Sequence, residues 1–99
     1  MRPHRREKIA SLLEQELGQL LIREIDFEGA IVTILKVDVS EDLGQAKISL
    51  GIIPYEKEPA AFLKVQEKSR ELQHKLLRKM NIRPMPKLEF EIVSGKSAV

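Results

Sequence analysis

The chain has 99 residues, of which 42% are hydrophobic and 32% are charged. This length fits one compact domain with a single core, and the composition favours a folded domain over disorder. The absence of cysteine excludes disulfides, thiolate chemistry and cysteine-ligated metals. No apolar run has the length of a signal peptide's core or a membrane span. We therefore expect a cytoplasmic protein that does not bind a membrane.

The formal net charge is only +2, but the charges are segregated along the chain. Residues 1–8 carry four basic residues against one acidic residue, and residues 64–87 carry eight against two. The rest of the chain is strongly acidic. Segregation of this kind predicts a positive surface able to meet phosphates and an acidic surface elsewhere, without identifying the partner.

The first element expected is an amphipathic helix from about Arg5 to Arg23. Its apolar residues recur at spacings of three and four, which is the helical period. Gly18 lies inside this helix, where glycine costs about 1 kcal/mol relative to alanine, so we expect it to mark a close contact. The apolar residues are Ile9, Leu12, Leu13, Leu17, Leu20 and Leu21.

An antiparallel hairpin follows, with strands over residues 30–40 and 45–53. Alternation places the odd-numbered apolar residues of the first strand on one face, and Lys36 and Asp38 on the other. In the second strand, the even-numbered residues from Ala46 to Ile52 are expected to point inward. We expect Gly44 to take a positive φ in the connecting turn, because glycine does so without steric cost.

A long second helix is expected from Pro59 to about Met80, followed by a third strand over residues 86–93. Proline is favoured in the first turn of a helix, and Asn81 with two later prolines ends it. Ser69 falls within the apolar stripe, where it would fit a bend or a tight contact. The order α-β-β-α-β, with a second helix long enough to be two pieces, predicts a two-layer α+β domain over residues 1–93 with a flexible tail at 94–99.

Four lysines share one flank of this second helix, beside its apolar stripe: Lys64, Lys68, Lys75 and Lys79. Such a stripe can contact phosphate oxygens, with an affinity that falls as salt rises. It can equally be the solvated face of a surface helix. Exposed aromatic residues on a strand, which a base-stacking platform would need, are not expected, so recognition of RNA backbone and shape is favoured over base reading.

The segment Val32–Lys47, which contains Val37-Asp38-Val39-Ser40-Glu41-Asp42-Leu43, resembles the most characteristic hairpin of ribosome-binding factor A. The segment Ile82–Phe90, with its Arg-Pro pair and Leu-x-Phe, is similar to a second signature of that family, and the basic start of the first helix is also similar. The resemblance implies a type II KH-like domain, α-β-β-α(-kink-α)-β, with a three-stranded sheet covered by helices. The family's kink carries an Ala-x-Gly pattern, whereas this chain has Lys68-Ser69-Arg70. Val93 also stands where the family often has Asp.

The resemblance further implies binding to the small (30S) ribosomal subunit and its 16S rRNA during late maturation, with roles in rRNA processing and cold adaptation. We expect a monomer that binds RNA rather than DNA. Together with the charge pattern, the resemblance predicts these RNA-binding residues: Lys64, Lys68, Arg70, Lys75, Arg78, Lys79, Arg83, Arg2, Arg5 and Arg6.

Catalysis has little support in the sequence. His4 and His74 are far apart and lack the spacing of metal ligands, and the carboxylates near Asp42 are ordinary turn chemistry. We therefore expect no enzyme, no metal and no cofactor. The alternative hypothesis is a protein-interaction module, in which the hairpin edge and the acidic surface recruit a protein by strand addition.

Overall fold

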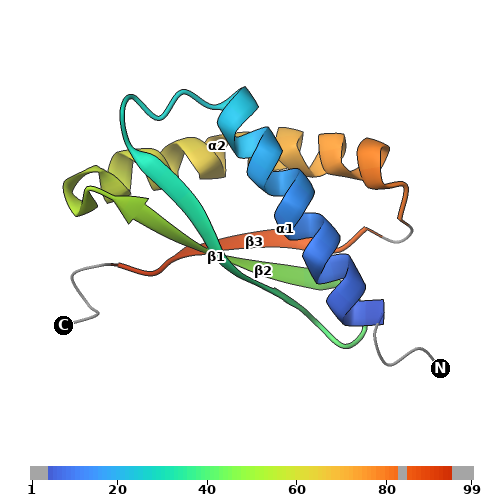
Figure 1. Ribbon diagram of the computed structural model, residues 1–99. Helices are drawn as coiled ribbons and strands as arrows, with labels where there is room; N and C mark the ends of the chain where they lie inside the picture. The colour runs from blue at the N-terminus through green and yellow to red at the C-terminus, as the bar shows by residue number, and fades with distance from the viewer. Residues whose placement is uncertain (1–4, 83–84, 95–99) are drawn as a thin grey trace.

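The computed structural model describes residues 5–82 and 85–94. Two helices cover one face of a three-stranded sheet, and the opposite face of the described sheet carries no helix (Figure 1). The predicted positions Arg2, Arg83 and most of the tail lie outside the described residues. The domain is therefore of the predicted two-layer α+β class, with the element order α-β-β-α-β.

Helix α1 spans Arg5–Glu24, within one residue of the predicted bounds. Its apolar stripe is buried in the core, with the exception of Leu12, which is 45% exposed. The expected close contact at Gly18 is wrong: a Cβ there would meet no atom within 4 Å. The glycine therefore faces open space, and no packing constraint accounts for it.

Strands β1 (Ile31–Val39) and β2 (Gln45–Ile53) form the predicted antiparallel hairpin. The inward face of β2 is as predicted, but the single face predicted for β1 is wrong in its first half. The register shifts between Ile34 and Lys36, which is a β-bulge. Before the bulge, Val32 and Ile34 face the core while Leu35 is exposed, and after it Val37 faces the core. One extra residue reverses the alternation, because side chains repeat every two residues.

Two backbone hydrogen bonds, Ser40 N–H to Gln45 O and Leu43 N–H to Ser40 O, close the hairpin turn, and side chains add to them. The carboxylate of Asp42 accepts hydrogen bonds from the Ser40 hydroxyl at 2.7 Å and from the Gly44 N–H at 2.9 Å. These bonds, the Ser40 bond first, hold the pKa of Asp42 below its ordinary value. The residue with positive φ is Leu43 (63°), so the expectation for Gly44 is wrong. A Cβ on Gly44 would lie 3.2 Å from the Asp42 Oδ1 atom, so this glycine allows close approach instead.

Helix α2 spans Glu58–Met80, directly after a short 3-10 turn, η1 (Tyr55–Lys57). Pro59 lies in its first turn, and Asn81 ends it in the left-handed conformation with φ 55°. The helix continues as one element through Ser69. Val65, Leu72 and Leu76 have no exposed surface and pack with α1 on the sheet.

Strand β3 (Lys87–Ile92) pairs in parallel with β2, which gives the sheet order β1-β2-β3. Parallel neighbours need a long connection between them, and α2 supplies it. Consequently β1 and β3 are the two edges of the sheet, and α2 passes back over the sheet towards the start of β3 (Figure 1).

Candidate nucleic-acid interface

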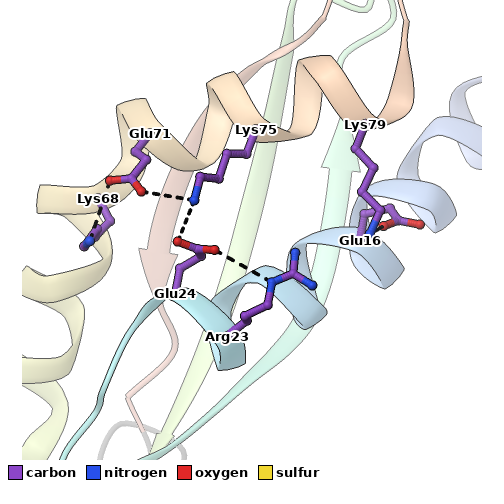
Figure 2. A network of polar contacts seen from close by, with 7 residues as sticks. All are labelled: Glu16, Arg23, Glu24, Lys68, Glu71, Lys75 and Lys79. Carbon is purple, nitrogen blue, oxygen red and sulfur yellow. Dashed lines mark hydrogen bonds and ion pairs between the residues drawn. The ribbon is translucent and has the colours of Figure 1, made fainter.

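The four stripe lysines lie on the side of α2 that faces α1 and the loop after it, and each forms an ion pair with a glutamate. We call this row of ion pairs the seam. Lys75 Nζ lies 2.7 Å from Glu24 Oε1 on α1 and 3.3 Å from Glu71 Oε2 on its own helix (Figure 2). Lys79 Nζ lies 2.9 Å from Glu16 Oε1 on α1, and Lys68 is 3.6 Å from Glu71. These contacts alternate in charge along the facing sides of the two helices (Figure 2).

Lys64 continues the seam at the loop that follows α1. Its Nζ donates a hydrogen bond to the Asp26 carbonyl at 2.6 Å and lies 2.9 Å from Glu28 Oε2. All four lysines therefore have carboxylate partners, which offset the positive charge of this flank. The sequence reasoning missed this seam because Glu16, Glu24 and Glu28 lie far upstream in the chain, in or just after a separate helix.

At the centre of the seam, the contact between Lys75 and Glu24 shifts the pKa of both side chains. The hydrogen bond from Lys75 holds the pKa of Glu24 below its ordinary value, against a smaller opposing effect of burial. The same hydrogen bond raises the pKa of Lys75. The RNA contact predicted for these four lysines stays a prediction, and the contacts that they make in the structure are with protein.

The N-terminal basic cluster lies at the other end of α1. The Nη1 atom of Arg6 is 3.8 Å from Glu41 Oε2 in the hairpin turn, and Arg5 is exposed. Arg6 lines a small hollow beside the turn together with Asp38, Lys47 and Glu89. These surroundings are of mixed charge, and the RNA contact predicted for Arg5 and Arg6 stays a prediction.

A larger groove lies on the opposite flank of α2, between that helix and the start of β3. We call it the α2–β3 groove; it has a volume of about 930 Å³. Polar and cationic side chains line it, with apolar side chains between them. The cationic and titratable residues are Arg70, His74 and Lys87, and the apolar residues are Leu77, Met85 and Leu88.

Gln73 fixes the two walls of this groove to each other. Its side-chain amide donates to the Pro86 carbonyl at 3.0 Å and accepts from the Leu88 N–H at 3.1 Å. Both backbone groups belong to the start of β3 or the residue before it, so one side chain on α2 holds the edge of the sheet in place. The groove is thus a built feature of the fold, with its width set by a pair of hydrogen bonds.

The basic side chains at this groove form no ion pair with an acidic residue in the described part of the chain. Within residues 5–82 and 85–94, neither Arg70 nor Lys87 forms an ion pair, and the nearby Arg78 on the exposed surface of α2 forms none either. Guanidinium and ammonium groups without an acidic partner, at the margin of an apolar groove, can contact phosphates while bases pack against the apolar side chains. Of the predicted RNA-binding residues, the structure therefore brings Arg70 to the groove itself.

Sequence reasoning missed Gln73, His74 and Lys87 as members of the groove. A pattern was nevertheless present, because residues 70, 73, 74 and 77 follow the i, i+3, i+4, i+7 spacing of one helix face. The other wall depends on the parallel pairing of β3, which the sequence pattern did not predict. Across the described chain, no group of three His, Asp or Glu side chains is placed to hold a metal ion. Neither described helix is long and apolar enough to cross a membrane.

Comparison with known proteins identifies the family. The family model described as ribosome-binding factor A matches residues 5–94. The chain belongs to the ribosome-binding factor A family. A member from Chlorobium phaeobacteroides (strain DSM 266) is 38% identical over 89 residues, which cover 87% of this chain and 77% of that protein. A member from Akkermansia muciniphila is 28% identical over 88 residues, covering 89% of this chain and 70% of that protein.

Solved structures of ribosome-binding factor A share the fold. The crystal structure of the Thermus thermophilus protein superposes with a TM-score of 0.74 at 20% identity, covering 88% of this chain and 94% of that one. A homology model of the Thermus thermophilus protein, fitted into a cryo-EM map of its complex with 30S, gives a TM-score of 0.72 at 22% identity, covering 83% and 88%. The likeness confirms the predicted fold and is consistent with a KH-like domain.

Proposed function

We propose that this chain binds the small (30S) ribosomal subunit at its 16S rRNA during late maturation, and acts by binding rather than by catalysis. Family membership supports the ribosome as the partner. The Thermus thermophilus relative fitted into a map of a 30S complex supports the small subunit. A role in rRNA processing and in cold adaptation belongs to the same proposal.

The observation that carries the proposal is the α2–β3 groove with its uncompensated cations. A cation without a carboxylate partner can contact a phosphate without first losing an ion pair, and that loss costs an exposed lysine about 0–1 kcal/mol. Arg70 and Lys87 meet that condition, and Arg78 extends the charge along α2. We therefore assign the main RNA contact to this groove, ahead of the lysine seam.

The chain acts by occupying its binding site on the rRNA, without a chemical step. A factor without covalent chemistry shifts the equilibrium between two rRNA conformations only by binding one of them more tightly. Gln73 supports this by keeping the groove open before RNA arrives, so that less ordering is needed on binding. Release then requires only that the mature rRNA conformation offers a poorer fit.

The test compares two double variants that remove the same charge. Arg70→Ala/Lys87→Ala removes two cations from the groove, and Lys36→Ala/Lys47→Ala removes two exposed cations from the outer face of the sheet. Co-sedimentation with isolated small subunits at several salt concentrations measures the affinity. We expect the groove variant to bind about tenfold more weakly and with a shallower salt dependence, since removing one phosphate interaction lowers the salt slope by about one unit. Equal weakening in both variants would show that only net charge matters and would reject the groove.

A further inference from the structure

The first half of the open edge of β1 lacks the residues that usually protect an exposed strand from pairing. In the described sheet β1 pairs with β2 alone, so alternate N–H and C=O groups on its other side face no strand. Natural proteins usually protect such edges with charges, prolines or bulges. Here the bulge comes only at Leu35, and residues 31–34, Ile-Val-Thr-Ile, contain neither charge nor proline.

Exposed aliphatic side chains flank this edge on both faces of the sheet. On the helix side, residues 21–32 line a hollow of about 700 Å³ between the end of α1 and the start of β1, which we call the edge groove. Ile22, on its rim, is 81% exposed. On the outer side, Ile31, Leu35 and Ile53 are each more than half exposed. A strand added beside β1 would thus cover apolar surface with both its faces.

One carboxylate at the edge groove, that of Asp26, favours a partner with a basic residue beside its apolar residues. The edge groove is lined by Arg23 and by three acidic residues, Glu24, Asp26 and Glu28, and Lys57 donates a hydrogen bond to the Glu28 carbonyl at its margin. Lys75 and Arg23 pair with Glu24, and Lys64 pairs with Glu28. The Asp26 carboxylate accepts the Glu28 N–H at 2.9 Å, but within the described ranges no lysine or arginine forms an ion pair with it. A carboxylate without an ion-pair partner attracts lysine or arginine.

We propose that residues 31–34 of β1 accept an extended peptide segment of a protein partner as a fourth strand. The segment has aliphatic residues where it pairs and basic residues beside them. The unpaired backbone of β1 supplies main-chain hydrogen bonds, the edge groove and the outer aliphatic residues supply apolar contact, and Asp26 supplies the charge preference. This site is at the opposite edge of the sheet from the α2–β3 groove, so the proposal does not depend on RNA binding.

The experiment uses the whole chain and a synthetic peptide of four valines flanked by two lysines at each end. NMR of the isotope-labelled protein reports the peptide's position through amide shifts and amide exchange. We expect slowed exchange at alternate residues within 31–34, and weaker binding by a matched peptide in which glutamates replace the lysines. Absence of shifts at millimolar peptide, or shifts confined to the α2–β3 groove, would overturn the proposal.

Two variants and a control distinguish peptide binding at the edge groove from nonspecific hydrophobic binding. Ile22→Ser and Ile31→Thr each remove exposed aliphatic surface from the proposed site, so we expect about tenfold weaker peptide binding. Leu12→Ser removes a half-exposed leucine from α1 outside the edge groove and is expected to leave binding unchanged. Equal weakening in the control contradicts the proposal. So does a single-stranded oligouridylate that shifts the amides of residues 31–34, because the edge would then be an RNA site.

Discussion

Single residues in this domain act through their position as much as through their type. Lys75 is one of eight basic residues between positions 64 and 87, and its ammonium bridges two carboxylates from two helices. Asn81 is a surface residue, yet its left-handed backbone ends α2. Such roles make single substitutions informative when a chemically matched control exists nearby.

The Lys75–Glu24 pair makes stability depend on pH in a defined direction. The pKa of Glu24 in the folded chain is lowered from about 4.5, so its contribution is fully present above that pH and is lost as the pH falls through the lower, folded value. The pKa of Lys75 is raised from about 10.5, so its contribution is lost only as the pH rises beyond that value. The pair therefore stabilises the fold fully between these limits.

Replacing Glu24 by Gln should remove part of the acid sensitivity. We expect Glu24→Gln to be less stable than the parent chain at pH 7, with a smaller further loss of stability as the pH falls from about 5 to about 3. Urea unfolding across this range measures the effect. Glu14→Gln, which neutralises an exposed carboxylate on the same helix, should keep the parental pH profile. Identical profiles for Glu24→Gln and the parent would contradict the role given to the pair.

Asn81 ends α2 with φ 55°, a conformation that costs most L-residues about 1–2 kcal/mol. Asparagine tolerates it and glycine adopts it freely. We expect Asn81→Ala to lower the free energy of unfolding by about 1 kcal/mol and Asn81→Gly to leave it unchanged or raise it slightly. Chemical denaturation measures both. A similar decrease in the two variants would show that the asparagine side chain, rather than backbone strain, decides the outcome.

At the scale of helices and strands, the spacing of hydrophobic residues predicted where most of these elements begin and end. The bounds of β2 agree with the prediction because its alternation is unbroken, and both helices begin and end within one residue of expectation. The β1 bulge was missed because Leu35 and Lys36 are compatible with either face in the sequence alone. The parallel pairing of β3 was missed because alternation identifies a strand without naming its neighbour.

The same limit applies to the candidate site. Helical spacing alone places Arg70, Gln73 and His74 on one face, but the groove exists only because β3 returns beside β2. Conversely, the lysine stripe suggests a free basic face until α1 is placed against it. Charge in a sequence indicates a binding surface only after its intramolecular partners are known.

Gln73 is the element-scale link between α2 and β3. Gln73→Ala removes both hydrogen bonds and leaves the Leu88 N–H without its partner, which costs about 1–3 kcal/mol for a group held from water. We expect faster amide exchange at Leu88 and weaker binding to small subunits. Gln66→Ala, at an exposed position on the same helix, is the control and should change neither. Unchanged exchange at Leu88 in Gln73→Ala would show that the glutamine does not hold the groove in place.

At the scale of the whole molecule, folding redistributes the charge that the sequence segregates. Carboxylates of α1, of its following loop and of α2 itself pair with the lysine flank of α2. In the described residues, Arg70 and Lys87, at the α2–β3 groove, form no ion pair. Asp26, the carboxylate after α1 for which the described residues provide no ion pair, lies by the other edge of the sheet. The domain thus presents a groove with unpaired cations at one edge and an edge with exposed aliphatic side chains at the other.

The measurement that tests the central claim most directly is site-specific crosslinking to the small subunit. The chain has no cysteine, so one introduced cysteine can carry a short photo-reactive group. Ser69→Cys places it in the α2–β3 groove, and Gln45→Cys places it on the exposed outer face of β2. We predict crosslinks to 16S rRNA from position 69 and few or none from position 45. Crosslinks to rRNA from position 45 without any from position 69 would contradict the assignment of the RNA contact to the groove.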